Sequence, residues 1–163
     1  MRERRQATAP HHRARGFAEF AGGAAGRLLH AATLLTAEPP ARNPRAQELL
    51  TAALAATYAR WDRLRDDDPY DRARQELVAR FARAAWRFHR PAAGGLLSRL
   101  TPQERLVLVL RLYEGVAEEQ AAALLGLPVE RVRAVCTRAV AALRHGAATP
   151  VAPPGAPDRA VTP

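Results

Sequence analysis

The stretch from Thr101 to His145 constrains the fold of this chain most, because its start and stop signals predict three helices in a fixed order. It opens with Thr101-Pro102-Gln103-Glu104, in which a hydroxyl cap, a proline at the first helical position and a reciprocal glutamate make a capping box. We expect the helix that starts there to end at Gly115, because glycine adopts the left-handed conformation at little cost. A short second helix should follow and end before Gly126. Its buried residues should be Ala121, Ala122, Leu124 and Leu125.

The third helix of this stretch begins after the break at Gly126-Leu127-Pro128. Its apolar residues recur at helical spacings of three and four: Val129, Val132, Cys136, Val140 and Leu143. Its solvent side should carry Arg131, Arg133 and Arg138. Two helices joined by a glycine-containing turn, the second one basic, are typical of a helix-turn-helix unit that inserts a helix into the DNA major groove. A helical hairpin whose arginines are simply solvated fits the pattern equally well.

Chain length and net charge limit the number of domains and the kind of partner that the chain can have. A chain of 163 residues holds one domain or two small ones of about 60–75 residues each. Units of that size bury little surface, so we expect them to pack against each other or a partner. The net charge of +9 comes from arginine alone and is spread along the chain. It suits a polyanionic partner, but a G+C-rich coding sequence would produce the same arginine-rich composition.

The first half of the chain predicts three further helices after an unfolded basic arm at residues 1–15. The first should run from Phe17 to about Thr36, with Gly22, Gly23 and Gly26 permitting a close helix contact. The second should start at Asn43-Pro44 and carry its apolar stripe as far as Trp61 and Leu64.

The third of these helices should run from Pro69 to about His89. The preceding Asp66-Asp67-Asp68 invites a metal site, but Asp68 before a proline is better explained as an N-cap. The side away from the core carries Trp86 among arginines: Arg72, Arg80, Arg83, Arg87 and Arg90. Cations beside an aromatic ring are typical of single-stranded DNA binding. A buried Trp86 is the alternative.

Nothing in the sequence predicts an enzyme. The chain has no glycine-rich phosphate loop, its five histidines are scattered, and its one cysteine, Cys136, fits a buried thiol. We therefore expect no catalytic residues, no cofactor, no metal and no small-molecule substrate. The most apolar long stretch is too short for a membrane span, and no secretion signal is apparent. These features predict a cytoplasmic protein.

The order of these segments resembles the small group IV (extracytoplasmic-function) sigma factors of bacterial RNA polymerase, particularly their SigE-like actinobacterial branch. The strongest pieces are Leu100-Thr101-Pro102-Gln103-Glu104-Arg105, Leu110-Arg111-Leu112-Tyr113-Glu114-Gly115 and Ala121–Val129. The weaker pieces are Phe17–Phe20, Leu28–Thr36, Ala46–Leu50, Tyr58–Trp61 and Asp68-Pro69. The resemblance implies an all-α protein of two small helical domains. These are a sigma region 2-like unit at 16–90 and a region 4-like helix-turn-helix at 100–146, with a linker at 91–99, and disordered termini at 1–15 and 147–163.

The resemblance also implies partners and roles. The chain would bind core RNA polymerase and promoter DNA, and an anti-sigma factor is a possible further partner. By position, the polymerase contacts would be Glu48, Leu49 and Trp61. The −10 element would be read by Arg80, Arg83, Trp86 and Arg87. The −35 element would be read by Arg131, Arg133 and Arg138.

Several departures from the family pattern bear on activity. Only one acid, Glu48, remains where the clamp-binding helix usually has more, and Ala134-Val135 replaces a frequent Ser-Arg in the last helix. Each lost charge-assisted contact weakens binding by about 1–3 kcal/mol. Two other hypotheses therefore stand beside the sigma factor. One is a diverged protein-interaction module that binds polymerase or a regulator without initiating transcription, and the other is an ordinary helix-turn-helix repressor.

Overall fold

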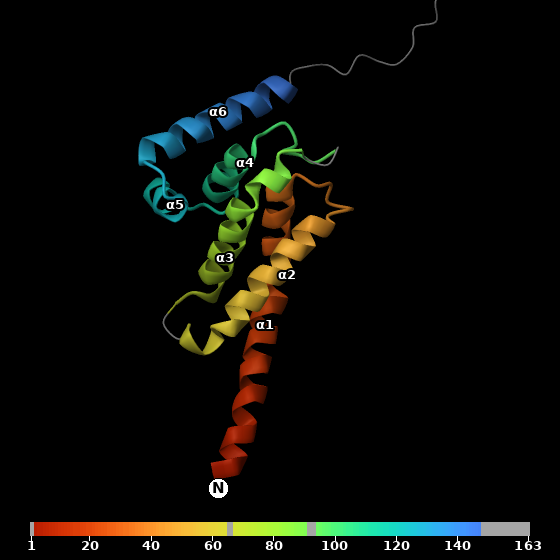
Figure 1. The fold of residues 1–163 in the computed structure, drawn as a ribbon, viewed down its shortest axis with the longest axis vertical. Helices are drawn as coiled ribbons and strands as arrows, with labels where there is room; N and C mark the ends of the chain where they lie inside the picture. Colours follow the sequence, from red (N-terminus) through yellow and green to blue (C-terminus); the bar gives the residue numbers. More distant parts are fainter. Residues whose placement is uncertain (1, 65–66, 91–93, 148–163) are drawn as a thin grey trace, which may run out of the picture.

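The structure, a computed structural model, describes residues 2–64, 67–90 and 94–147. Within these residues the chain is all-α, as predicted, and contains no strand (Figure 1). The α-helices are α1 (Arg2–Thr36), α2 (Pro44–Ala59), α3 (Pro69–Arg83), α4 (Pro102–Leu108), α5 (Glu118–Leu125) and α6 (Val129–Ala147). Short 3₁₀ turns, η1 (Trp61–Arg63) and η2 (Ala85–Phe88), follow α2 and α3, and the π-helical segment η3 (Val109–Tyr113) continues α4.

The predicted N-caps at Asp68 and Thr101 are confirmed, and so is the predicted left-handed helix end at Gly115, with φ of 68°. The Asp68 carboxylate accepts a hydrogen bond from the Tyr70 backbone N–H at 2.9 Å. The Thr101 hydroxyl accepts from the Glu104 N–H at 3.3 Å, while the Glu104 carboxylate accepts from the Thr101 N–H at 3.0 Å, which completes the capping box. Gly126 is left-handed, with φ of 64°.

The cap of α2 works differently from the prediction. Asn43 precedes Pro44 as expected, but its side chain makes no cap bond and instead donates to the Thr33 hydroxyl at 2.8 Å. The buried carboxylate of Glu38 takes that place, accepting from the backbone N–H groups of Arg45 and Ala46 at 3.2 and 2.9 Å. An acidic group there complements the positive end of the helix dipole.

Three helix boundaries differ from the prediction. α1 begins at Arg2, so residues 2–15, expected to be unfolded, continue this helix; the five Arg and three Ala among them are good helix formers. α2 ends at Ala59 and leaves Trp61 on η1. α3 ends at Arg83, because the Ala84 N–H bonds to both Arg80 and Phe81 and tightens the chain into η2.

The glycine prediction for α1 is wrong. A Cβ atom added at Gly22, Gly23 or Gly26 would meet nothing within 4 Å, so none of them permits a close helix contact. The close approach is at Gly95, in the stretch expected to be a linker, where a Cβ would lie 1.8 Å from the Ala37 carbonyl oxygen. Nearby Leu97 is buried, so this stretch packs onto the body of the protein. Residues 91–93 and 148–163 lie outside the described residues.

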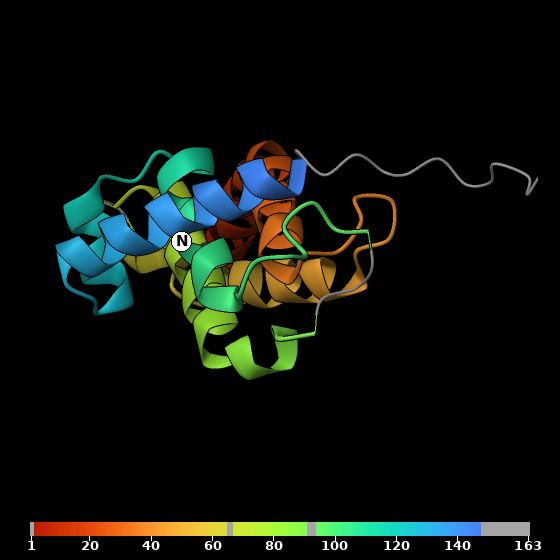
Figure 2. The ribbon, with the colours of Figure 1, turned by 90° about the horizontal axis from the view of Figure 1, so that it is seen from above.

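One hydrophobic core joins the two halves of the chain. α2 and α3 pack on each other and on α1, while α4 packs on both α1 and α3 and supports α6 from beneath (Figures 1 and 2). The first residues of α1 project beyond the other helices (Figure 1). This arrangement fixes the position of α6 relative to α3, the two helices that carry the predicted DNA contacts.

Candidate nucleic-acid interface

α5 and α6 form the predicted helix-turn-helix, with Gly126 in the turn between them. The buried side of α6 consists of Val132, Val135 and Ala139, which together anchor it on α4 and α5. The expected Cys136, Val140, Val129 and Leu143 are only partly buried and flank that side. Val135 is therefore a core residue with no exposed surface, and a side chain at this position could not reach DNA.

The three predicted arginines of α6 are all exposed, but two of them are held by carboxylates. Arg133 donates from Nε and Nη2 to one oxygen of Glu118 at 3.1 and 2.8 Å, which ties α6 to the start of α5. Arg138 donates from Nε to Glu104 at 2.9 Å, which ties α6 to the capping box of α4. Arg131 forms no ion pair with any residue that the structure describes. The sequence predicted the exposure of these arginines but not their pairing.

These contacts lower the pKa values of two carboxyl groups, those of Glu118 and Glu104. The hydrogen bond from Arg133 lowers the pKa of Glu118. Burial of Glu104 acts to raise its pKa, but hydrogen bonds from the Thr101 backbone and from Arg138 outweigh that effect and lower it. Both groups therefore remain charged counterions to the arginines at neutral pH.

The helical register of α6 places Arg131, Arg133 and Arg138 toward the edges of the exposed side. With about 100° between successive residues, Glu130, Ala134 and Thr137 occupy the middle of that side, and all three are exposed. Arg131 and Arg133 lie toward opposite edges. If the start of α6 enters a major groove, the arginines are placed for phosphates on either side and Glu130 for the base edges between them.

A second group of predicted residues gathers at the end of α3. Trp86 is 73% exposed, so the buried alternative is excluded, and Arg83 and Arg87 are exposed beside it. Arg80 is less available for a contact with DNA, because Glu76 accepts hydrogen bonds from it and from Arg72. Burial acts to raise the pKa of Glu76, but these two arginines lower it overall.

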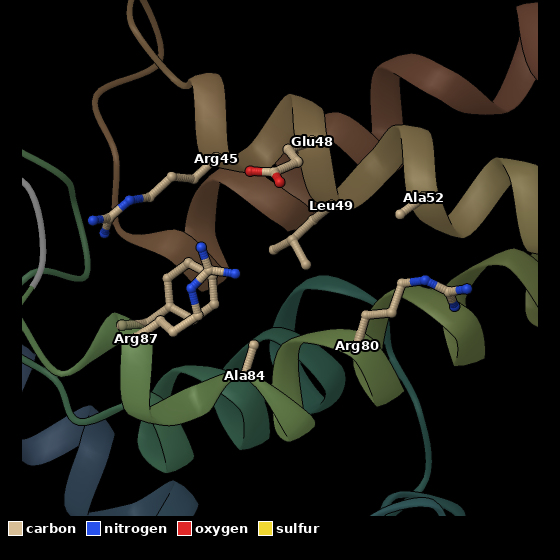
Figure 3. A pocket seen from close by; sticks show the side chains of 8 residues that line it. Arg45, Glu48, Leu49, Ala52, Arg80, Ala84 and Arg87 are labelled. Atoms are coloured by element: carbon tan, nitrogen blue, oxygen red, sulfur yellow. The ribbon is translucent and has the colours of Figure 1, made fainter.

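The predicted polymerase contacts do not form one cluster. Glu48 and Leu49 line a groove of about 300 Å³ between α2 and α3, opposite Arg80 and Arg87 (Figure 3). Trp61 lies elsewhere. Its ring packs against Phe17 and Phe20 of α1, with centroids 5.2 and 5.3 Å apart, and it is partly buried.

The described residues hold no group of three or more His, Cys, Asp or Glu side chains that could bind a metal ion. Asp67 and Asp68 line a shallow acidic depression with Asp71, but Asp68 acts as the cap of α3. No described helix is both long and apolar enough to cross a membrane.

The fold and the exposed basic side of α6 define this chain as an all-α helix-turn-helix protein. Residues 96–145 match the sigma-70 region 4 family. The chain is 28% identical over 153 residues to the RNA polymerase sigma-E factor of Streptomyces coelicolor, covering 79% of this chain and 84% of that protein. It is 29% identical over 153 residues to the sigma-E factor of Streptomyces avermitilis, covering 79% and 83%. These findings confirm the resemblance of this chain to sigma factors of the sigma-E type.

Proposed function

We propose that this protein is a sigma factor that directs core RNA polymerase to promoters in the cytoplasm and carries out no chemistry of its own. The observation that carries the proposal is the match of residues 96–145 to sigma-70 region 4, together with a helix-turn-helix whose second helix keeps its basic side exposed. The similarity to two sigma-E factors extends this support to the first half of the chain.

In this proposal α6 reads the −35 element and the end of α3 reads the −10 element. Arg131 and Arg133 supply phosphate contacts on either side of the groove, and Arg138 chiefly braces α6 against α4. Arg83, Trp86 and Arg87 offer cations beside an exposed ring, which suits capture of an unstacked base. Opening the duplex costs a few kcal/mol, and such contacts must offset that cost. Glu48, Leu49 and Trp61 remain proposed contacts to polymerase.

The direct test is run-off transcription from genomic DNA with core polymerase and the purified chain. Promoter-dependent transcripts that require the added protein would support the proposal. Co-purification with polymerase but no transcripts from any template would contradict it and favour an interaction module.

A substitution test isolates the use of α6. Arg131→Ala removes an exposed cation without breaking an internal ion pair, so promoter affinity should fall about 5- to 100-fold while the melting temperature stays unchanged. Arg133→Ala should weaken binding as well, but it also releases Glu118. Arg144→Ala, an exposed change in the last turn of the same helix, is the control. Equal affinity of the Arg131 and Arg144 variants would exclude α6 as the reading helix.

A further inference from the structure

Glu118 lies where the start of α5 meets the exposed side of α6, between two arginines. Its Oε2 atom accepts hydrogen bonds from Nε and Nη2 of Arg133 at 3.1 and 2.8 Å. Its Oε1 atom lies 3.6 Å from Nη2 of Arg111. The Arg133 guanidinium therefore presents one edge to this carboxylate. Two neighbouring N–H groups on one edge are also what an arginine uses to bind a phosphate.

The local structure of α5 gives Glu118 no capping role. Ala117 is the N-cap of this helix, and no side chain makes a cap hydrogen bond there. Glu104, the other carboxylate that holds an arginine of α6, differs because it also accepts from the Thr101 backbone. Glu118 and Arg133 both reach solvent, and exposed ion pairs add little to stability. The main effect of Glu118 is therefore on the charge that α6 offers to a ligand.

A phosphate that approaches Arg133 has to compete with Glu118. If α6 enters the major groove, Arg133 lies at one edge of its exposed side, where the sugar-phosphate backbone runs. Binding there exchanges one ion pair for another and leaves the carboxylate beside the phosphate without its counterion. Arg131, toward the other edge, forms no ion pair with a described residue, so no internal ion pair has to break there.

We propose that Glu118 is an intramolecular competitor for DNA phosphate at Arg133 and thereby weakens the binding of α6 to duplex DNA. Contacts to phosphate supply nearly all of sequence-independent binding, so Glu118 lowers the affinity for DNA of arbitrary sequence. The inference rests on the proposed function only in that α6 contacts DNA. It requires neither promoter reading nor polymerase.

Glu118→Gln tests the proposal, because it keeps the size of the side chain and removes the competing charge. Fluorescence anisotropy measures the affinity of the full-length protein for a labelled duplex of arbitrary sequence, about 20 base pairs long, over a series of salt concentrations. We expect the affinity at low salt to rise about 3- to 10-fold. The slope of log affinity against log salt should steepen by about 0.9, the value for one further phosphate contact.

Glu119→Gln is the matched control. Glu119 is the neighbouring acid in the first turn of α5, and it forms no ion pair with a described residue. Its substitution removes the same charge and the same interaction with the helix dipole, so it measures the general loss of repulsion between protein and DNA. The Glu118 variant should exceed it in affinity and in slope. In an Arg133→Ala background the two substitutions should have about equal effects.

Three results would overturn the proposal, once circular dichroism has confirmed that each variant is folded. Weaker DNA binding by Glu118→Gln would mean that the carboxylate positions Arg133 for phosphate. Equal effects of the Glu118 and Glu119 substitutions with Arg133 present would mean that the ion pair does not affect binding. The third result is absence of duplex binding at low salt with either Glu or Gln at position 118. Failure of promoter-dependent transcription with duplex binding retained would reject the proposed function alone.

Discussion

At the scale of single residues, Arg105 is the side chain on which the joined core depends most. It has no exposed surface, and it donates to the backbone carbonyl of Leu35 at 2.5 Å and to that of Phe88. Burial lowers the pKa of its guanidinium to about 10, which still leaves it charged at neutral pH. One arginine of the second half thus satisfies the ends of two elements of the first half.

Replacing Arg105 should destabilise the whole protein. Arg105→Met keeps most of the volume but leaves two buried carbonyl groups without donors, so the free energy of unfolding should fall by about 3–5 kcal/mol. Urea denaturation measures this loss. Arg99→Met, on an exposed residue, should change the free energy of unfolding by less than about 0.5 kcal/mol. If the free energy of unfolding fell as little for the Arg105 variant as for the Arg99 variant, the hydrogen bonds of the buried guanidinium would not stabilise the fold.

The register of α6 can be tested at two neighbouring residues. Val135→Arg introduces a charge into the core and should lower the melting temperature by more than about 10 °C, as expected from a loss of several kcal/mol. Ala134→Arg adds the same side chain to the exposed side and should leave the melting temperature nearly unchanged. Thermal unfolding followed by circular dichroism compares the two. Similar melting temperatures would show that Val135 is not in the core.

At the scale of elements, the capping box links the start of α4 to α6 through a charge that depends on pH. The Glu104 carboxylate accepts from Thr101 and from Arg138, and its folded pKa lies below the ordinary value of 4.5. A carboxyl group with a lowered folded pKa stabilises the protein above its unfolded pKa. That contribution is lost as the pH falls through the folded pKa.

Glu104→Gln should therefore cost stability at neutral pH and little in acid. Glutamine can still accept from the Thr101 backbone, so the loss at pH 7 should be about 1 kcal/mol, mainly from the bond with Arg138. The difference between wild type and variant should shrink as the pH is lowered from about 5 to 3. Urea unfolding at a series of pH values measures it. A difference that does not change with pH would contradict the proposed charge contact.

The elements also show what could be predicted from the sequence and what could not. The caps at Asp68 and Thr101 were predictable, because each bonds to a backbone N–H only two or three residues ahead. The cap of α2 was not, because Glu38 reaches it only after the chain has turned back. In the candidate site, the exposure of Arg131 followed from helical periodicity, whereas the sequence left open whether Trp86 is exposed or buried. The pairing of Arg133 with Glu118, fifteen residues away, depends on tertiary packing.

At the scale of the whole molecule, a polar contact holds the two halves together beside the core. The Glu114 carboxylate, at the end of η3, accepts from the Tyr70 hydroxyl of α3 at 3.0 and 3.1 Å. Arg27 of α1 and Arg74 of α3 lie 3.4 and 3.7 Å from it. Burial and the hydrogen bond to Glu114 raise the pKa of Tyr70, so the hydroxyl remains a donor at neutral pH. The contact therefore joins α1 and α3 of the first half to the end of η3 in the second half.

Loss of the Glu114 carboxylate should destabilise the contact between the two halves of the chain more than it destabilises either half. Glu114→Ala removes the acceptor of the Tyr70 hydroxyl and the counterion of the half-exposed Arg27, while Arg74 keeps Asp71 at 2.9 Å. The loss of stability should therefore stay below the about 3–5 kcal/mol typical of breaking a fully buried ion pair. We expect amide hydrogen exchange to accelerate first in η3 and in the parts of α1 and α3 that face it, while α2 and α6 stay protected. Glu119→Ala, on an exposed acid of α5, is the control and should leave the exchange pattern unchanged. Uniform acceleration along the chain would instead mean that the two halves unfold as one cooperative unit, in which this contact has no local role.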